Sequence, residues 1–183
     1  NDKLLQPDGT LSKEVMPDLL HQNEKGYAIW AEAIAPFVTQ TLRASVAPVS
    51  RMHESWWKTR FGQKQALVKQ GGWQVVFVGD SITHGWEGAG KAVWEQHIAP
   101  YQALNLGYGG DRTEHVLWRL GNGELDGYQP KLLVLMIGTN NTGHRPEVQE
   151  RPEDTAAGIK AILEKIAKKS PATRVVLMPI FPR

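Results

Sequence analysis

The 183-residue chain contains no cysteine. This absence excludes disulfide bridges, a thiol nucleophile and cysteine-ligated metal sites, and it leaves the redox character of the compartment open. A long hydrophobic run is also missing, so we expect no membrane span, and the first residues do not resemble a signal peptide. Charge of one sign is not in excess either, because the formal net charge is only +2. Such a balance gives no electrostatic case for a nucleic-acid or membrane partner.

The composition that remains is typical of a globular domain. Hydrophobic residues make up 41% of the chain and charged residues 22%, which are ordinary values. The length is sufficient for one domain with a sizeable core, so we expect residues 1–183 to form a single domain.

Apolar runs alternate with helical patterns along most of the chain. The runs predict four strands, at Val75–Val78, Ala103–Leu106, Leu132–Ile137 and Val175–Met178. Amphipathic periodicity predicts helices from Tyr27 onward, over Glu54–Lys69 and over Pro152–Lys169. Pro36 should kink or restart the first of these helices. Strands alternating with helices indicate an α/β fold with a parallel sheet, which we expect to be a flavodoxin-like three-layer α/β/α sandwich.

Polar loops follow three of these strands: Gly79-Asp80-Ser81, Gly109-Gly110-Asp111 and Gly138-Thr139-Asn140-Asn141. The carboxyl ends of parallel strands meet at one sheet edge, so these loops can converge there. Ser81 is then a candidate nucleophile. The backbone N–H groups of Ser81 and Gly110 and the side-chain amide of Asn140 are candidate oxyanion donors. Asp80 is expected only to cap a helix.

A base and a group that orients it can come from Asp18-Leu19-Leu20-His21. The imidazole of His21 is the candidate general base, and a carboxylate three residues earlier can bond its other nitrogen. By propensity alone, G-D-S is a helix N-cap and D-L-L-H is a turn. Their occurrence together with G-T-N-N favours a serine-hydrolase site. No histidine spacing, including that of His144, is typical of zinc, and the loop after the second strand lacks the G-x-G-x-x-G spacing of a dinucleotide fold.

These four blocks resemble the SGNH, or GDSL-type, esterase superfamily. Within it the chain is most similar to the platelet-activating-factor acetylhydrolase-like branch, through G-D-S-I-T-H-G-W, N-L-G-Y-G-G-D-R-T-E-H-V-L-W-R-L-G-N-G-E-L and I-G-T-N-N. The resemblance implies a Ser-His-Asp triad of Ser81, His21 and Asp18. It also implies an oxyanion hole of Ser81, Gly110 and Asn140, with no metal or organic cofactor.

The order of the blocks departs from that of the family, in which the Asp-x-x-His block lies near the C-terminus. Residues 1–42 resemble the family's C-terminal part and 51–183 its N-terminal and middle parts, with 43–50 as a linker, so we expect a circularly permuted domain. Beyond Pro179–Arg183 the family continues with a helix and a strand. Either the permuted fold lacks this last strand, or the chain is a fragment, or it joins the end of one domain to the start of the next.

The resemblance implies a serine esterase acting on small acyl groups, acetyl above all. An acetylated carbohydrate is the first expected substrate, because bacterial-looking members of this branch are often carbohydrate esterases. A lipid or lysophospholipid ester is the alternative, and so is an inactive binding module in which the triad does not assemble. A homo-oligomer is left open, and a secreted or periplasmic location is favoured over a cytoplasmic one.

Overall fold

The computed structural model describes residues 4–42, 44–143 and 150–181. His144 and the last two residues of the predicted final loop therefore lie outside the described residues. The chain divides into two compact units, Asn1–Arg43 and Ala44–Arg183, here called the N-terminal unit and the C-terminal unit.

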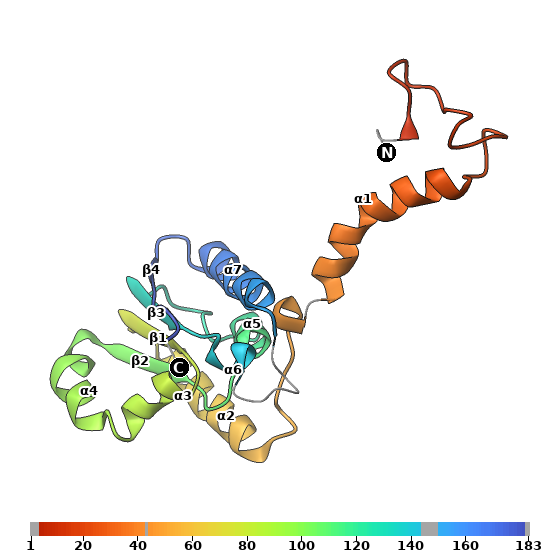
Figure 1. The fold of residues 1–183 in the computed structure, drawn as a ribbon. Helices are drawn as coiled ribbons and strands as arrows, with labels where there is room; N and C mark the ends of the chain where they lie inside the picture. The colour runs from red at the N-terminus through yellow and green to blue at the C-terminus, as the bar shows by residue number, and fades with distance from the viewer. Residues whose placement is uncertain (1–3, 43, 144–149, 182–183) are drawn as a thin grey trace. The chain divides into compact units, whose positions relative to one another are not determined.

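The N-terminal unit consists of turns followed by one long helix (Figure 1). In the expected turn, Asp8 Oδ1 accepts hydrogen bonds from the backbone N–H and the hydroxyl of Thr10. Helix α1 (Glu24–Leu42) then runs through Pro36 without being divided into two helices. The large side chains of its apolar face are exposed, among them Trp30 and Phe37.

The C-terminal unit is built on a parallel sheet of four strands: β1 (Val75–Gly79), β2 (Ala103–Gly107), β3 (Leu132–Met136) and β4 (Arg174–Leu177). The strand order is β2-β1-β3-β4. In the register of the sheet, Gly79 lies opposite both Gly107 and Met136. The loops that follow β1, β2 and β3 therefore begin at the same edge, as the sequence predicts.

One face of the sheet carries the main core. Helices α2 (Ser55–Gln70), α5 (Thr113–Gly121) and α7 (Pro152–Lys169) contribute to it. The alternating strand residues that point toward these helices are buried, as are Val116, Leu120, Ile162 and Ile166 on α5 and α7. Each such side chain stabilises the fold by about 1.5–3 kcal/mol when fully buried.

The opposite face is covered by α3 (Ser81–His84), the 3-10 turns η3 (Gly85–Glu87) and η4 (Ala99–Tyr101), and α4 (Lys91–His97). On α4, Trp94 packs edge-on against Phe77 of β1 with ring centroids 5.0 Å apart. Helices therefore lie on both faces, and the predicted α/β fold with a parallel sheet is confirmed.

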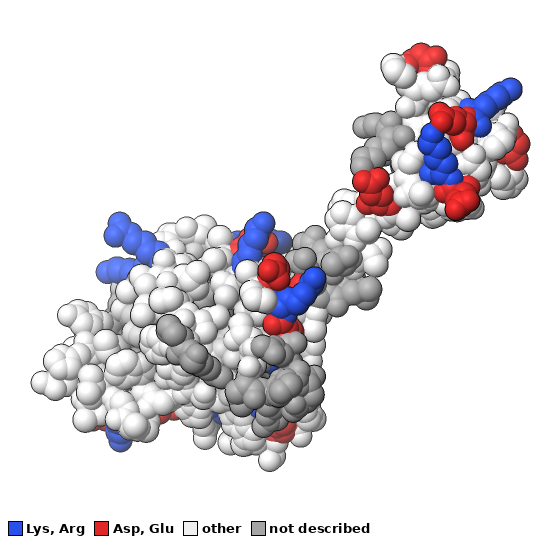
Figure 2. Space-filling view, viewed as in Figure 1, with Lys and Arg blue, Asp and Glu red and all other residues white. Residues whose placement is uncertain are grey.

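An apolar pocket of about 470 Å³ lies on this second face. Its lining includes Phe77, Val134 and Met136 from the sheet, together with Ile82, Trp86 and Phe181. In the view of Figure 2, uncharged residues form most of the surface of this unit, and the charged side chains lie mainly at its margins. No helix within the described ranges is long and apolar enough to cross a membrane.

The segment from Ala44 to Ser50 packs on the C-terminal unit. It begins with the 3-10 turn η2 (Ala44–Val46), in which Ser45 is fully buried. The Ser45 hydroxyl donates to the carbonyl of Asp154 at 2.6 Å, and its carbonyl accepts from the Thr113 hydroxyl at 2.9 Å. These bonds tie the segment to α5 and α7.

Candidate active site

Ser81 is the first residue of α3, directly after the carboxyl end of β1. Asp80 caps this short helix, because its Oδ1 accepts a hydrogen bond from the backbone N–H of Ile82 at 2.9 Å. The capping role expected for Asp80 is thus confirmed. A Cβ at Gly79 would lie 2.2 Å from the Thr83 hydroxyl oxygen, so only glycine allows α3 to turn back so closely over the strand. This turn leaves Ser81 exposed at the sheet edge.

Buried polar contacts position the loop after β2. Asn105 donates its side-chain amide to the carbonyl of Thr83 at 2.8 Å, and its Oδ1 accepts from the Gly107 N–H at 2.8 Å. Asn105 therefore ties the start of this loop to the helix that begins with Ser81. Further along, Gly110 has a φ of +72°, in the left-handed region that favours glycine.

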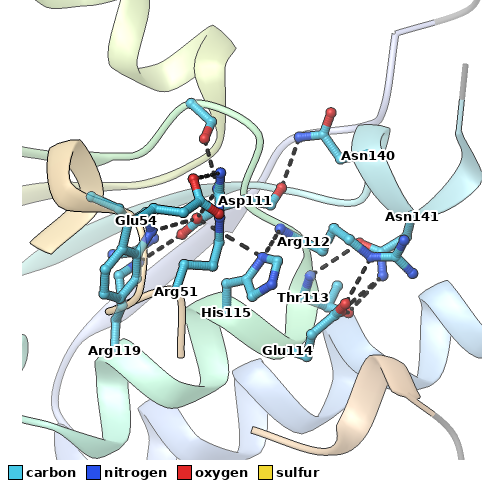
Figure 3. A network of polar contacts seen from close by, with 12 residues as sticks. Arg51, Glu54, Asp111, Arg112, Thr113, Glu114, His115, Arg119, Asn140 and Asn141 are labelled. Carbon is cyan, nitrogen blue, oxygen red and sulfur yellow. Dashed lines mark hydrogen bonds and ion pairs between the residues drawn. The ribbon is translucent and has the colours of Figure 1, made fainter. Parts of the chain in front are cut away.

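Asn140 lies on α6 (Thr139–Thr142), directly after β3. Its side-chain amide donates to the carbonyl of Asp111 at 2.8 Å. The next residue, Asn141, accepts from the Thr113 N–H at 3.0 Å through Oδ1. Two adjacent asparagines thus hold the loop that carries Gly110, and Figure 3 shows how they lie beside Asp111 and Thr113.

The fully buried carboxylate of Asp111 is surrounded by donors. Its Oδ1 accepts from Arg51 Nη1 at 3.0 Å and from Trp57 Nε1 at 2.9 Å. Its Oδ2 accepts from Arg119 Nε at 2.8 Å. Burying a carboxylate without partners is costly, so these charge-assisted bonds fix both the side chain and the backbone on either side of it.

Arg51 is held in turn by Glu54, which accepts from Nε and from Nη2, each at 2.8 Å (Figure 3). Burial would lower the pKa of Arg51, but the hydrogen bond from its guanidinium to Glu54 and the charge of Asp111 raise it. The hydrogen bond from Arg51 lowers the pKa of Glu54. Both groups are therefore charged across the physiological range.

Burial and nearby cations lower the pKa values of two histidines of this unit. The pKa of His84, which lies on α3, is lowered mainly by burial and to a smaller extent by the charge of Arg60. The pKa of His115 falls to about 4, chiefly through burial and against the opposing charge of Asp111. These side chains are therefore neutral at pH 7.

Asp18 and His21 form a pair in the N-terminal unit. His21 Nδ1 lies 2.7 Å from Asp18 Oδ2, while Asp18 Oδ1 accepts from the backbone N–H groups of Leu20 and His21. Hydrogen bonds from His21 lower the pKa of Asp18 to about 2, and the bond from the backbone N–H contributes more than the bond from the ring. The carboxylate is therefore ionised and leaves Nε2 of His21 as the ring atom that faces away from it.

The predicted site residues thus fall into two groups. Ser81, Gly110 and Asn140 lie at one sheet edge of the C-terminal unit, and Asp18 and His21 lie in the N-terminal unit. Sequence reasoning missed the supporting network of Arg51 and Asp111. Asp111 could have been found, because a conspicuous carboxylate ends the glycine loop, but no local pattern marks Arg51.

Among the described residues, no group of three or more histidine, aspartate or glutamate side chains is arranged to hold a metal ion.

A family model for the GDSL-like Lipase/Acylhydrolase family matches residues 77–183. The chain therefore belongs to this family, and the resemblance to the SGNH superfamily is confirmed. The alpha1 subunit of human platelet-activating factor acetylhydrolase IB is 43% identical over 113 residues, which is 60% of this chain and 44% of that protein. The human alpha2 subunit is 39% identical over 109 residues, with the same coverage of 60% and 44%.

A solved structure from Streptococcus pneumonia, provisionally described as a platelet activating factor, has a similar fold. Its TM-score is 0.53 at 24% sequence identity, and the match covers 72% of this chain and 60% of that one. The chain spans less than half the length of the curated relatives that it matches. The permuted order of residues 1–42 and 51–183 stays a prediction.

Proposed function

We propose that this protein is a carboxylic ester hydrolase with Ser81 as its nucleophile. The observation that carries the proposal is the position of Ser81, which is exposed at the start of α3 beside the loops of Gly110 and Asn140. A serine in the first turn of a helix lies among backbone N–H groups that have no partner within the helix. Such donors favour an oxyanion that forms when the hydroxyl attacks an ester carbonyl.

The surroundings of Gly110 and Asn140 support their assignment to the oxyanion hole. Within the described part of the chain, no acceptor occupies the N–H of Gly110. Asn140 uses one amide hydrogen for Asp111, and an amide NH₂ group carries two. Each residue thus has a donor that can bind the oxygen of a tetrahedral intermediate.

His21 is the proposed general base, and the Asp18 pair supports this role. With Nδ1 bonded to Asp18, a neutral imidazole can accept a serine proton at Nε2. Ser81 Oγ then forms the bond to the ester carbonyl carbon, and the protonated imidazole returns the proton to the departing alcohol. The same base then accepts a proton from a water molecule, which attacks the acyl-enzyme. This step releases the acid and regenerates Ser81.

The proposed acyl group is acetyl. The support is the name acetylhydrolase carried by relatives that are 43% and 39% identical. For the alcohol we propose a carbohydrate first. A lipid alcohol is the second candidate, and the apolar pocket of about 470 Å³ that Ile82 lines, one residue from Ser81, favours it.

The test is turnover of p-nitrophenyl acetate, compared with longer acyl chains, and then of acetylated xylan against an acetylated lysophospholipid. Ser81→Ala should abolish hydrolysis and leave the melting temperature nearly unchanged, because the side chain is small and exposed. Ser55→Ala is a matched control, since Ser55 is also exposed and also begins a helix. Turnover retained by Ser81→Ala would remove Ser81 as nucleophile, and a wild-type chain that binds without turnover would favour the binding module.

A further inference from the structure

The peptide that joins Gly109 to Gly110 is held by a distant side chain. Arg51 donates from Nη1 to the carbonyl of Gly109 at 2.8 Å and to Asp111 Oδ1 at 3.0 Å. One nitrogen thus bonds to the residues on either side of Gly110. The guanidinium also lies close to Gly110 itself, because a Cβ there would be 3.4 Å from Nη1.

The carbonyl of Gly109 and the N–H of Gly110 belong to the same peptide unit. A trans peptide is planar, and its C=O and N–H bonds point in opposite directions. A donor that fixes the direction of the Gly109 carbonyl therefore also fixes the direction of the Gly110 N–H. Two consecutive glycines allow this plane many orientations without such a bond.

The bond also has an electrostatic effect. A cationic donor on the carbonyl polarises the amide and makes its N–H a stronger donor to an anion, because hydrogen bonds in a chain strengthen one another. Arg51 can act in this way because it is itself fixed. Its side chain is 15% exposed, and Glu54 holds it in a two-bond pair.

We propose that Arg51 is a positioning residue for the reaction, which aims the Gly110 N–H at the oxyanion. This inference rests on the proposed function. Arg51 acts through the Gly109–Gly110 peptide and not on the substrate. Its loss therefore reduces the stabilisation of the transition state and leaves the binding of the ester almost unaffected.

The experiment compares Arg51→Met and Arg51→Lys in the full chain. Loss of one oxyanion donor costs roughly a hundred- to a thousand-fold in kcat, so a misdirected donor in Arg51→Met should lower kcat by about ten- to a hundred-fold with little change in KM. Arg51→Lys should recover part of this loss, because lysine keeps a charged donor but not the planar fork. The inhibition constant of methylboronic acid, whose adduct with serine has a tetrahedral boron that carries an oxygen like that of the reaction intermediate, should rise as kcat falls.

Arg60→Met is the matched control. Arg60 is likewise buried, pairs with Glu87 and donates to a backbone carbonyl, that of Gly107 at 2.8 Å. The N–H of that peptide belongs to Tyr108 and already bonds to Gly79. Arg60→Met should therefore lower the melting temperature as much as Arg51→Met but change kcat by less than about threefold.

The outcomes separate the two proposals. Turnover that survives in Ser81→Ala, or no turnover in the wild type, overturns the proposed function. The positioning role of Arg51 is contradicted by a different result, in which Ser81→Ala is inactive but Arg51→Met has the same kcat as Arg60→Met. A change of KM alone in Arg51→Met would contradict it as well.

Discussion

At the scale of single residues, Asn140 combines an observed structural bond with a proposed catalytic one. One amide hydrogen binds the carbonyl of Asp111 and so supports the loop after β2. The other is the one proposed to bind the oxyanion. A residue of this kind should show a large effect on catalysis and a modest one on stability, since a single neutral hydrogen bond contributes about 1 kcal/mol.

We predict that Asn140→Ala lowers kcat by about a hundred- to a thousand-fold, the usual cost of one oxyanion donor. KM should move little, because this bond strengthens only in the transition state. Steady-state kinetics with p-nitrophenyl acetate measures both constants. A change confined to KM would make Asn140 a substrate-binding residue instead.

The pH dependence of activity tests His21. If a histidine is the base, kcat/KM should fall as the pH is lowered into the acid range, because an imidazole that already carries a proton cannot accept one from the serine. The pKa of Asp18, lowered to about 2 mainly by the backbone N–H of His21, keeps its carboxylate ionised over that range, so only one acid limb is expected. A flat profile from about pH 5 to 8 would contradict a histidine base.

At the scale of elements, the start of α5 depends on a neutral histidine. The backbone N–H of Arg112, the N-cap, donates to Nδ1 of His115 at 3.0 Å. Burial lowers the pKa of His115 to about 4, and the charges of Arg51, Arg112 and Arg119 add to this effect against Asp111. Protonation would remove the acceptor and place a cation among arginines.

We predict that the chain loses stability as the pH falls from about 6.5 to about 4, because only the unfolded state binds a proton at His115 in that window. The free energy of unfolding should fall by about 3 kcal/mol, since each pKa unit corresponds to 1.36 kcal/mol. Urea unfolding across this window measures it. His115→Gln, which keeps an acceptor, should flatten the dependence, whereas the exposed His97→Gln should not; equal slopes in all three proteins would refute the prediction.

The elements themselves follow the local pattern closely where a core surrounds them. All four predicted strands are present. In α2, Trp57 is buried and its neighbour Trp56 is exposed, because only one face of this helix points into the core. In α1 the same kind of periodicity is present, yet Trp30 and Ile34 are exposed. Periodicity defines an apolar face but not what covers it.

At the scale of the whole molecule, the prediction of one domain over residues 1–183 can be tested by calorimetry of the full chain. A single domain should unfold in one transition whose calorimetric enthalpy equals the van't Hoff enthalpy. Two transitions would show that Asn1–Arg43 and Ala44–Arg183 unfold independently. That result would favour a chain that joins the end of one domain to the start of the next.

The sequence by itself determined the parallel α/β sheet and the polar residues at its edge. Apolar runs and the glycines that end them act locally, and parallel topology then brings Ser81, Gly110 and Asn140 to one edge. Only the tertiary structure decided how that edge is supported. Arg51 and Asp111 lie 60 positions apart, and their bond forms because folding buries a carboxylate that must find donors, which no local pattern encodes.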